Sequence, residues 1–399
     1  MLQRLIHSAR VNVFESARFY YWVSIGLVSF SFLNRAFRKA SVVFFDNDIL
    51  LLKLVETTIF ALIYLFLFIS LFFLYNKTKK FILFCLLGLY VIFLINEALF
   101  SFNSSTYFLL ESLISGEFFY VAKVTFPIIF FGVFDCFEDK VKYAIQFVSI
   151  VEKFILLNGL FIIIGFLFDV PFFKNYIHSD RWGYSGLIYY LNINCFLYGS
   201  YLIYNLLSHK KSYLNIVIHF VCLILLGQKA AYLYIYFIFL FLVIKSTYYR
   251  WILASLVGFC LLSTKYWVSK VVGFSPFWSE VYNSHGILGL ITSLRNENFI
   301  RIFSVEQPEL NFLHWLIGGI TRFPSKVEIL PLDFFIHFGL TGVFFYLMFC
   351  ISLIPKIAWG IPLIVSCFAG GLYESPTGML IYLMIIIVSK NNVKRSLLA

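Results

Sequence analysis

The run LLKLVETTIFALIYLFLFISLFFLY at residues 51–75 decides the fold class, because almost all of its side chains are apolar. A helix needs roughly 20 predominantly apolar residues to cross the hydrocarbon core of a bilayer. A second run, FILFCLLGLYVIFLINEALFS at residues 81–101, follows after a short basic segment. The sequence therefore predicts a pair of membrane-spanning helices at this point.

Apolar runs of this kind recur along the chain and predict about 12 transmembrane helices, within a range of roughly 10–13 because several runs are short. They lie near residues 19–34, 51–75, 81–101, 114–134, 143–168, 187–207, 213–227, 230–246, 250–265, 333–354, 357–371 and 377–389. We expect an all-α polytopic membrane protein. Its parts would be N-terminal membrane helices at 1–265 with a short outer loop at 169–186, one large, partly helical outer loop at 266–332, and C-terminal membrane helices at 333–399.

The composition of the 399 residues supports this class, since 61% are hydrophobic and only 13% are charged. A soluble domain usually has about 25% charged residues. A soluble enzyme, a disordered chain and a coiled coil are therefore excluded. The aromatic share of 21% fits either AT-rich codon usage or aromatic faces that line a ligand cavity, so it does not decide the function.

The net charge of +11 is explained by basic residues in cytoplasmic loops, so no nucleic-acid partner is expected. Lys and Arg gather in alternate loops, and this pattern predicts that both termini are cytoplasmic and that the loops at 169–186 and 266–332 lie outside. Arg35, Arg38 and Lys39 break the pattern, so the first hairpin is the weakest part of this topology.

Several chemical motifs are missing from the sequence. It has no G-x-x-x-x-G-K-[ST] phosphate loop, no dinucleotide glycine fingerprint and no H-x-x-x-H pair. We therefore expect no nucleotide, metal or other cofactor. Any substrate would have to carry its own activated group.

Basic residues on the predicted outer side are candidates for binding a diphosphate, which Arg can hold through paired hydrogen bonds. Lys229 is one of them, because it lies in the turn LLGQKAAYL between two apolar runs, where a charge is costly and usually functional. Arg181, Arg295 and Arg301 lie in the two outer loops. The alternative is that the large loop is simply solvated, since its basic and acidic residues are nearly balanced.

Acidic candidates lie in SKVEILPLDFF, at the predicted outer membrane face. A partly desolvated carboxylate at Glu328 is placed to take a proton from a hydroxyl group of a substrate. Asp333 falls near a helix start, where helix capping is the favoured alternative. His314 is a further candidate in the same loop. The mixed apolar and polar spacing of this loop predicts amphipathic helices on the membrane surface.

These features, in this order, resemble the bacterial O-antigen polymerase family and the related O-antigen ligases. The matching patches are Arg181-Trp-Gly followed by Leu191-Asn192, Gly227-Gln228-Lys229-Ala230-Ala231, Arg295, and Glu328 with Gly339 and Gly342 at 11 and 14 residues beyond it. Gln228 stands where Ser is usual, and Gly370-Gly371-Leu372-Tyr373-Glu374-Ser375-Pro376 lacks the family's His. Ligases usually carry His-Asn at the position of Glu328, so the acid favours a polymerase.

The resemblance implies a metal-independent glycosyltransferase of the bacterial inner membrane. It would join undecaprenyl-diphosphate-linked oligosaccharide repeats at the periplasmic face, with membrane lipids, a chain-length regulator and a flippase as its partners. Glu328 and Arg295 would then be catalytic, and Lys229, Arg181 and Arg301 would hold the diphosphate. Asp333 and His314 remain secondary candidates.

Three other functions stay open. An O-antigen ligase would use the same donor with a lipid A core acceptor. A polysaccharide flippase or other transporter would also have about 12 spans, but no internal repeat is visible and a large loop on one face alone is not needed for transport. A scaffold subunit explains neither Lys229 nor the spacing after Glu328.

Overall fold

The computed structural model describes residues 16–45, 50–100, 117–176, 182–188, 191–208, 212–245, 248, 251, 255, 279–286, 295–306, 311–320, 327, 329–369, 372 and 375–398. Within these ranges the chain is almost entirely helical and has no strand, only an isolated antiparallel bridge between Lys174 and Tyr184. The predicted all-α class is confirmed for this part of the chain.

Each predicted apolar run overlaps a helix, except for the run at 250–265, of which only Trp251 and Ser255 are described. The first helix continues beyond the predicted run 19–34 to Phe45, so Arg35, Arg38 and Lys39 lie within it and not in a loop. The helices of the first half are α2 (Ala17–Phe45), α3 (Leu50–Phe73), α4 (Lys80–Phe100), α6 (Glu117–Phe134), α7 (Lys140–Leu167), α8 (Leu191–Leu207), α9 (Tyr213–Leu225) and α10 (Lys229–Lys245). Those of the second half are α13 (Arg295–Ile300), α14 (Phe312–Ile317), α15 (Leu330–Leu353), α16 (Ile361–Ala369) and α17 (Pro376–Leu398). Three shorter helical segments are η1 (Pro171–Phe173), the π-helical η2 (Arg301–Glu306) and η3 (Ile357–Gly360), and residues 279–286 are also helical.

Three described segments are long and apolar enough to cross a membrane, namely Leu54–Phe73, Lys140–Leu167 and Pro331–Leu353. Other apolar helices in the described ranges are shorter, at 10–17 residues. Large apolar side chains also face outward from the bundle, as Leu62 and Phe72 of α3 do with 62% and 78% of their surface exposed. Such an apolar exterior suits a lipid environment.

The second half of helix α2 buries several polar and charged side chains. Its buried face includes Ser31, Asn34, Arg35 and Lys39, whereas Phe37 is 63% exposed. Polar and charged side chains within membrane segments generally face the interior of a bundle, because lipid cannot solvate them. These polar and charged side chains of α2 therefore lie inside the helix bundle.

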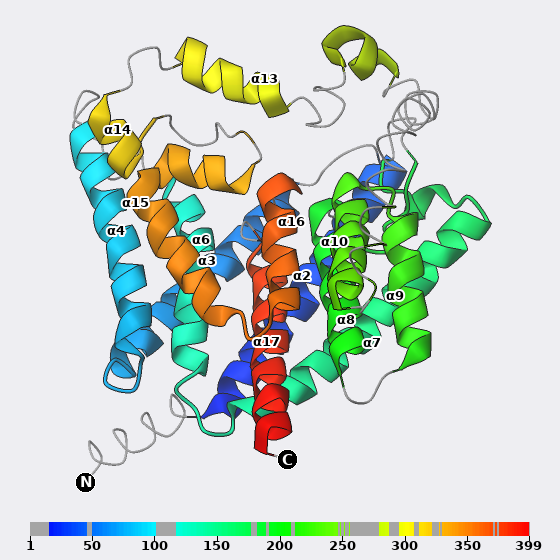
Figure 1. The fold of residues 1–399 in the computed structure, drawn as a ribbon, viewed down its shortest axis with the longest axis horizontal. Coiled ribbons are helices and arrows are strands. Elements are labelled where there is room, and N and C mark those ends of the chain that lie inside the picture. The colour runs from blue at the N-terminus through cyan, green and yellow to red at the C-terminus, as the bar shows by residue number, and fades with distance from the viewer. Residues whose placement is uncertain are drawn as a thin grey trace.

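Helix α15 is broken at Gly339, whose φ of 62° and ψ of −171° are not helical. The first half, 330–338, and the second half, 340–353, run in clearly different directions (Figure 1). Helices α13 and α14 of the large loop lie at one end of the bundle, opposite the C-terminal end of α17 (Figure 1). The break thus occurs where the loop meets the bundle.

Candidate functional site

A small group of buried apolar residues fastens the large loop to the first half of α15. We call this group the loop cluster, and its members are Ile302, Ile320, Val327, Phe335 and Ile336. Four partly buried residues pack against it: Phe303, Ile329, Leu332 and Val343. The rings of Phe303 and Phe335 lie parallel, with their centroids 6.4 Å apart. The loop cluster therefore brings η2 beside the start of α15.

The loop cluster also brings together two parts of the predicted site. Ile302 directly follows the candidate Arg301, and Val327 and Ile329 flank position 328. Glu328 itself lies outside the described residues, as does Arg181. What the structure establishes is that the neighbours of Arg301 and of Glu328 in the sequence share one apolar cluster.

Asp333 holds the turn that leads into α15. Its side chain is buried, with the residue 2% exposed, and its Oδ1 accepts a hydrogen bond of 2.6 Å from the N–H of Val327. The carbonyl of Ile329 accepts hydrogen bonds of 2.9 Å from the N–H groups of Leu332 and Asp333. Asp333 lies in the first turn of α15, but its hydrogen bond goes to the segment ahead of the helix, and the N-cap residue Ile329 has no side-chain cap hydrogen bond.

The break in α15 receives the end of α14 in direct backbone contact. A Cβ on Gly339 would lie 2.5 Å from the amide nitrogen of Gly318, closer than real carbon atoms approach. Asn96 of α4 donates from Nδ2 to the carbonyls of Ile317 and His337, at 2.6 and 2.9 Å. The α14–α15 junction is therefore held from a third helix.

This junction gives a physical reason for the glycine spacing seen in the sequence. Gly339 has a positive φ and no room for a side chain, and a Cβ on Gly342 would lie 2.1 Å from Cβ of Phe338. Both glycines that follow Glu328 are thus required by the shape of α15. Thr341, between them, donates from Oγ1 to the carbonyl of Leu316 at 2.8 Å.

His314 caps the helix α14. Its N–H donates to Oδ1 of Asn311 at 3.1 Å, and the N–H of Asn311 donates to Nδ1 of His314 at 3.3 Å. Burial lowers the pKa of His314 below its ordinary value, which keeps Nδ1 in the neutral form that accepts a hydrogen bond. This reciprocal capping box gives His314 a structural role.

Arg295 and Arg301 begin the consecutive elements α13 and η2. Arg295 is half-buried and Arg301 is exposed. A carboxylate oxygen of Glu297, between them, contacts Nδ1 of His285. Both arginines belong to the segment that η2 attaches to the loop cluster.

Lys229 lies at the start of α10, in a turn that packs against the earlier outer segment. Gly227 has a φ of +64°, and a Cβ there would lie 2.1 Å from the carbonyl oxygen of Trp182. The N–H of Tyr184 donates to the carbonyl of Leu225 at 2.9 Å. The Trp-Gly part of the arginine patch and the Gly-Gln-Lys turn, which are far apart in the sequence, are thus in contact.

A set of basic residues inside α2 was missed as a candidate site. Lys39 is fully buried and donates to Oγ of Ser185 at 2.6 Å and to the carbonyl of Gly186 at 2.7 Å. Arg35 and Arg38 lie on the same side of the helix. The spacing of 35, 38 and 39 places them on one helix face, a signal that was visible in the sequence.

Comparison with models of known protein families finds no match, and neither does comparison with curated proteins or with solved structures. Among the described residues, no group of three or more His, Cys, Asp or Glu could hold a metal ion. The fold and the site therefore define a class and no more: an apolar helical bundle with a loop fastened over one end by the loop cluster and the α14–α15 junction.

Proposed function

We propose that this chain is a surface polysaccharide polymerase. It would join oligosaccharide repeats carried on a lipid diphosphate, of the undecaprenyl type, at the periplasmic face of a bacterial inner membrane. About 12 spans, cytoplasmic termini and an outer position for the loop at 266–332 belong to the same proposal. The sequence resemblance to the O-antigen polymerases is where the proposal begins.

The observation that carries the proposal is the loop cluster. It fixes the segment with Arg301 against the residues on either side of position 328, at the end of an apolar bundle. An enzyme that reacts at a lipid headgroup needs cations for the leaving group and a base for the acceptor at that end of the bundle. The loop cluster holds the sequence neighbours of one candidate for each role.

In the proposed reaction the acceptor hydroxyl attacks the anomeric carbon of the donor sugar. A new glycosidic bond forms, the bond to the lipid diphosphate breaks, and the bonding electrons leave with the diphosphate. Glu328 takes the proton of the hydroxyl, a contribution of roughly 10²–10⁴ in rate. Arg295, with Arg301, Lys229 and Arg181, stabilises the negative charge that grows on the leaving group.

The test is the surface polysaccharide of a strain that lacks this gene, compared on a gel with a complemented strain. We expect a single repeat on the acceptor lipid and no ladder, with the ladder restored on complementation. An unchanged ladder would contradict both the polymerase and the ligase function. Lipid A core without any repeat, together with accumulating lipid-linked polymer, would indicate an O-antigen ligase in place of a polymerase.

A further inference from the structure

Helix α14 of the large loop presents a large apolar face on the outside of the molecule. Phe312 is 76% exposed and Trp315 is 47% exposed, and Leu313 and Leu316 are exposed as well. Residues 311–320 contain no Asp, Glu, Lys or Arg. A helix on a water-facing loop normally turns polar and charged side chains outward. An exposed apolar face of this kind marks a surface that contacts a partner or a membrane.

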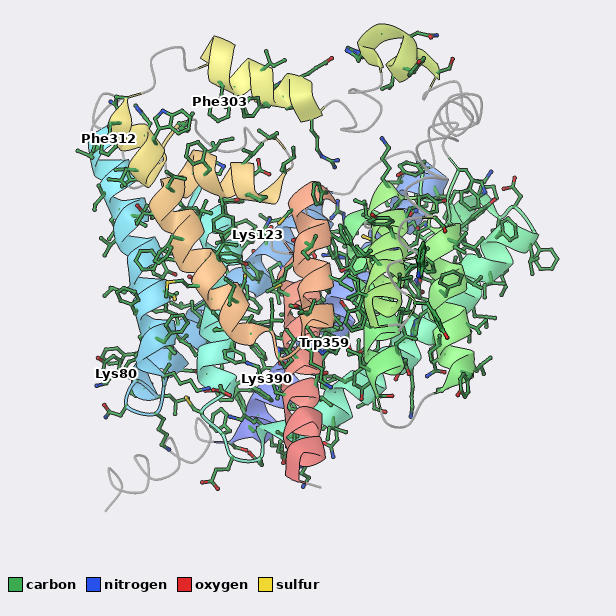
Figure 2. The ribbon with its side chains drawn as sticks, in the orientation of Figure 1. Lys80, Lys123, Phe303, Phe312, Trp359 and Lys390 are labelled. Atoms are coloured by element: carbon green, nitrogen blue, oxygen red, sulfur yellow. The ribbon has the colours of Figure 1, made fainter. Side chains whose placement is uncertain are left out.

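The rest of α14 is firmly attached, so its apolar face points in a fixed direction. The ring of Trp315 packs on Phe335 of the loop cluster, with the ring centroids 5.1 Å apart. Ile317 is buried, and the capping box of Asn311 and His314 closes the start of the helix. The exposure of Phe312 therefore belongs to a well-formed helix. Figure 2 shows Phe312 beside the end of α4, at the outer edge of the molecule.

The apolar face of α14 continues the apolar exterior of the two helices beneath it. On α4, Leu94 and Leu99 are exposed, and on α15 Leu340 is exposed. Thr341, next to Leu340, donates to the carbonyl of Leu316, which brings α14 against this part of α15. Helix α15 contains a segment that is long and apolar enough to cross a membrane. A lipid environment around α4 and α15 would therefore extend directly onto α14.

The depth of α14 along the bundle supports contact with lipid. Its last residue, Ile317, accepts a hydrogen bond from Asn96 of α4. Since a helix rises about 1.5 Å per residue, Asn96 lies about 6 Å before the end of α4 at Phe100. The exposed Leu99 lies beyond Asn96, so the end of α14 is level with the apolar exterior of α4 and not above it. Helices that lie in a membrane surface bury their apolar face by roughly 5–10 Å.

We propose that α14 is an in-plane membrane anchor, whose exposed face lies in the bilayer at the boundary between headgroups and acyl chains. Trp is enriched at this boundary, where Trp315 would lie. The partner is the phospholipid bilayer, and neither a second copy of this chain nor another protein. Helix α13, which lies farther from the bundle than α14 in Figure 1, is not part of the anchor.

This anchor does not depend on the polymerase proposal, because a transporter or a scaffold could carry it equally well. Its consequence concerns the loop. Helix α14 is tied to the break in α15 through Gly318 and Gly339, so lipid that holds α14 also holds this junction at the membrane surface. The large loop is then fixed by the bilayer as well as by the loop cluster.

The test uses the full-length protein, labelled with fluorotryptophan, in phosphatidylcholine nanodiscs. The fluorine signal that is missing from W315F belongs to Trp315, and the signal missing from W22F belongs to Trp22, an exposed residue of α2 that serves as the control for lipid contact. The relaxation rate of each signal is measured with three paramagnetic probes. These are a lipid with a nitroxide near the headgroup end of its acyl chain, a lipid with a nitroxide near the methyl end, and a water-soluble gadolinium chelate.

We expect the headgroup-end nitroxide to raise the relaxation rate of Trp315 by about twofold or more, and to act more strongly than the other two probes. A strongest effect from the gadolinium chelate would place α14 in water, and a strongest effect from the methyl-end nitroxide would place it at the bilayer centre. A weak effect from all three probes, with Trp22 responding to lipid, would mean that protein covers α14. Each of these three results would overturn the proposal.

A second measurement tests whether lipid contact holds α14 in place. In nanodiscs, F312S should speed amide hydrogen exchange over residues 311–317 by about tenfold, because the variant loses the free energy of placing a Phe side chain in lipid. The matched control is I300S, at an exposed Ile of α13, which should exchange like the wild type over the same residues. Equal exchange in F312S and I300S would contradict an anchor at α14.

Discussion

Gly318 and Gly339 face each other backbone to backbone where the large loop meets α15. Each has a positive φ, +88° and +62°, and a Cβ on either residue would lie within 2.6 Å of the amide nitrogen of the other. Neither residue can therefore carry a side chain without moving the loop away from the helix. This contact ties the loop position to the break in α15.

Replacement of Gly339 by Ala should destabilise the protein by about 2 kcal/mol or more. The new side chain is strained at this φ and collides with backbone, which cannot rotate away as a side chain can. The measurement is thermal unfolding of the purified variant in detergent. Gly26→Ala is the matched control, because nothing lies within 4 Å of a Cβ there and Ala favours a helix. Equal unfolding temperatures for the two variants would contradict the described junction.

Asp333 should tolerate Asn but not Ala. The oxygen of an Asn side chain can still accept the N–H of Val327, whereas Ala leaves that buried donor unsatisfied at a cost of roughly 1–3 kcal/mol. Polymer length on a gel and protein abundance in the membrane are the readouts. A D333N variant as inactive as D333A would show that Asp333 acts through its charge, as a catalytic group would.

The α14 cap should weaken as the pH falls. Burial lowers the pKa of His314, so the unfolded segment binds a proton more readily than the folded one, and folding stability is lost as the pH drops through the ordinary His value of about 6.5 and below. Amide hydrogen exchange in 311–318, measured between pH 7 and pH 5, should show this opening. The H314Q variant should lose the pH dependence. An identical response in wild type and H314Q would assign it to another group.

The sequence predicts the position of α15 well but not its break. The predicted run at 333–354 and the observed helix Leu330–Leu353 differ by only a few residues. The agreement is close because the length of an apolar run can be read directly from the local sequence. Gly339 within that run is compatible with a helix by itself. The break depends on Gly318 and Asn96, which are distant in the sequence, so no local pattern could reveal it.

The basic residues of α2 show a different limit of sequence reasoning. The charge rule for membrane loops treats Arg35, Arg38 and Lys39 only as exceptions and indicates no site there. The structure places Lys39 fully inside the bundle and Arg35 against Glu56, so these charges belong to the interior of the bundle. Burial of charge at the end of a long helix depends on its neighbours, and Glu56 comes from another helix, α3.

Glycosyl transfer through Glu328, in the loop beside α15, is best tested with the polymer ladder of a deletion strain that expresses E328Q. The exposed Glu280 in the same loop provides the matched control E280Q. We expect E328Q to reach the membrane at normal abundance but to make about a hundredfold less polymer, because the general base is lost, and we expect E280Q to restore the full ladder. A full ladder from E328Q would contradict this role of Glu328.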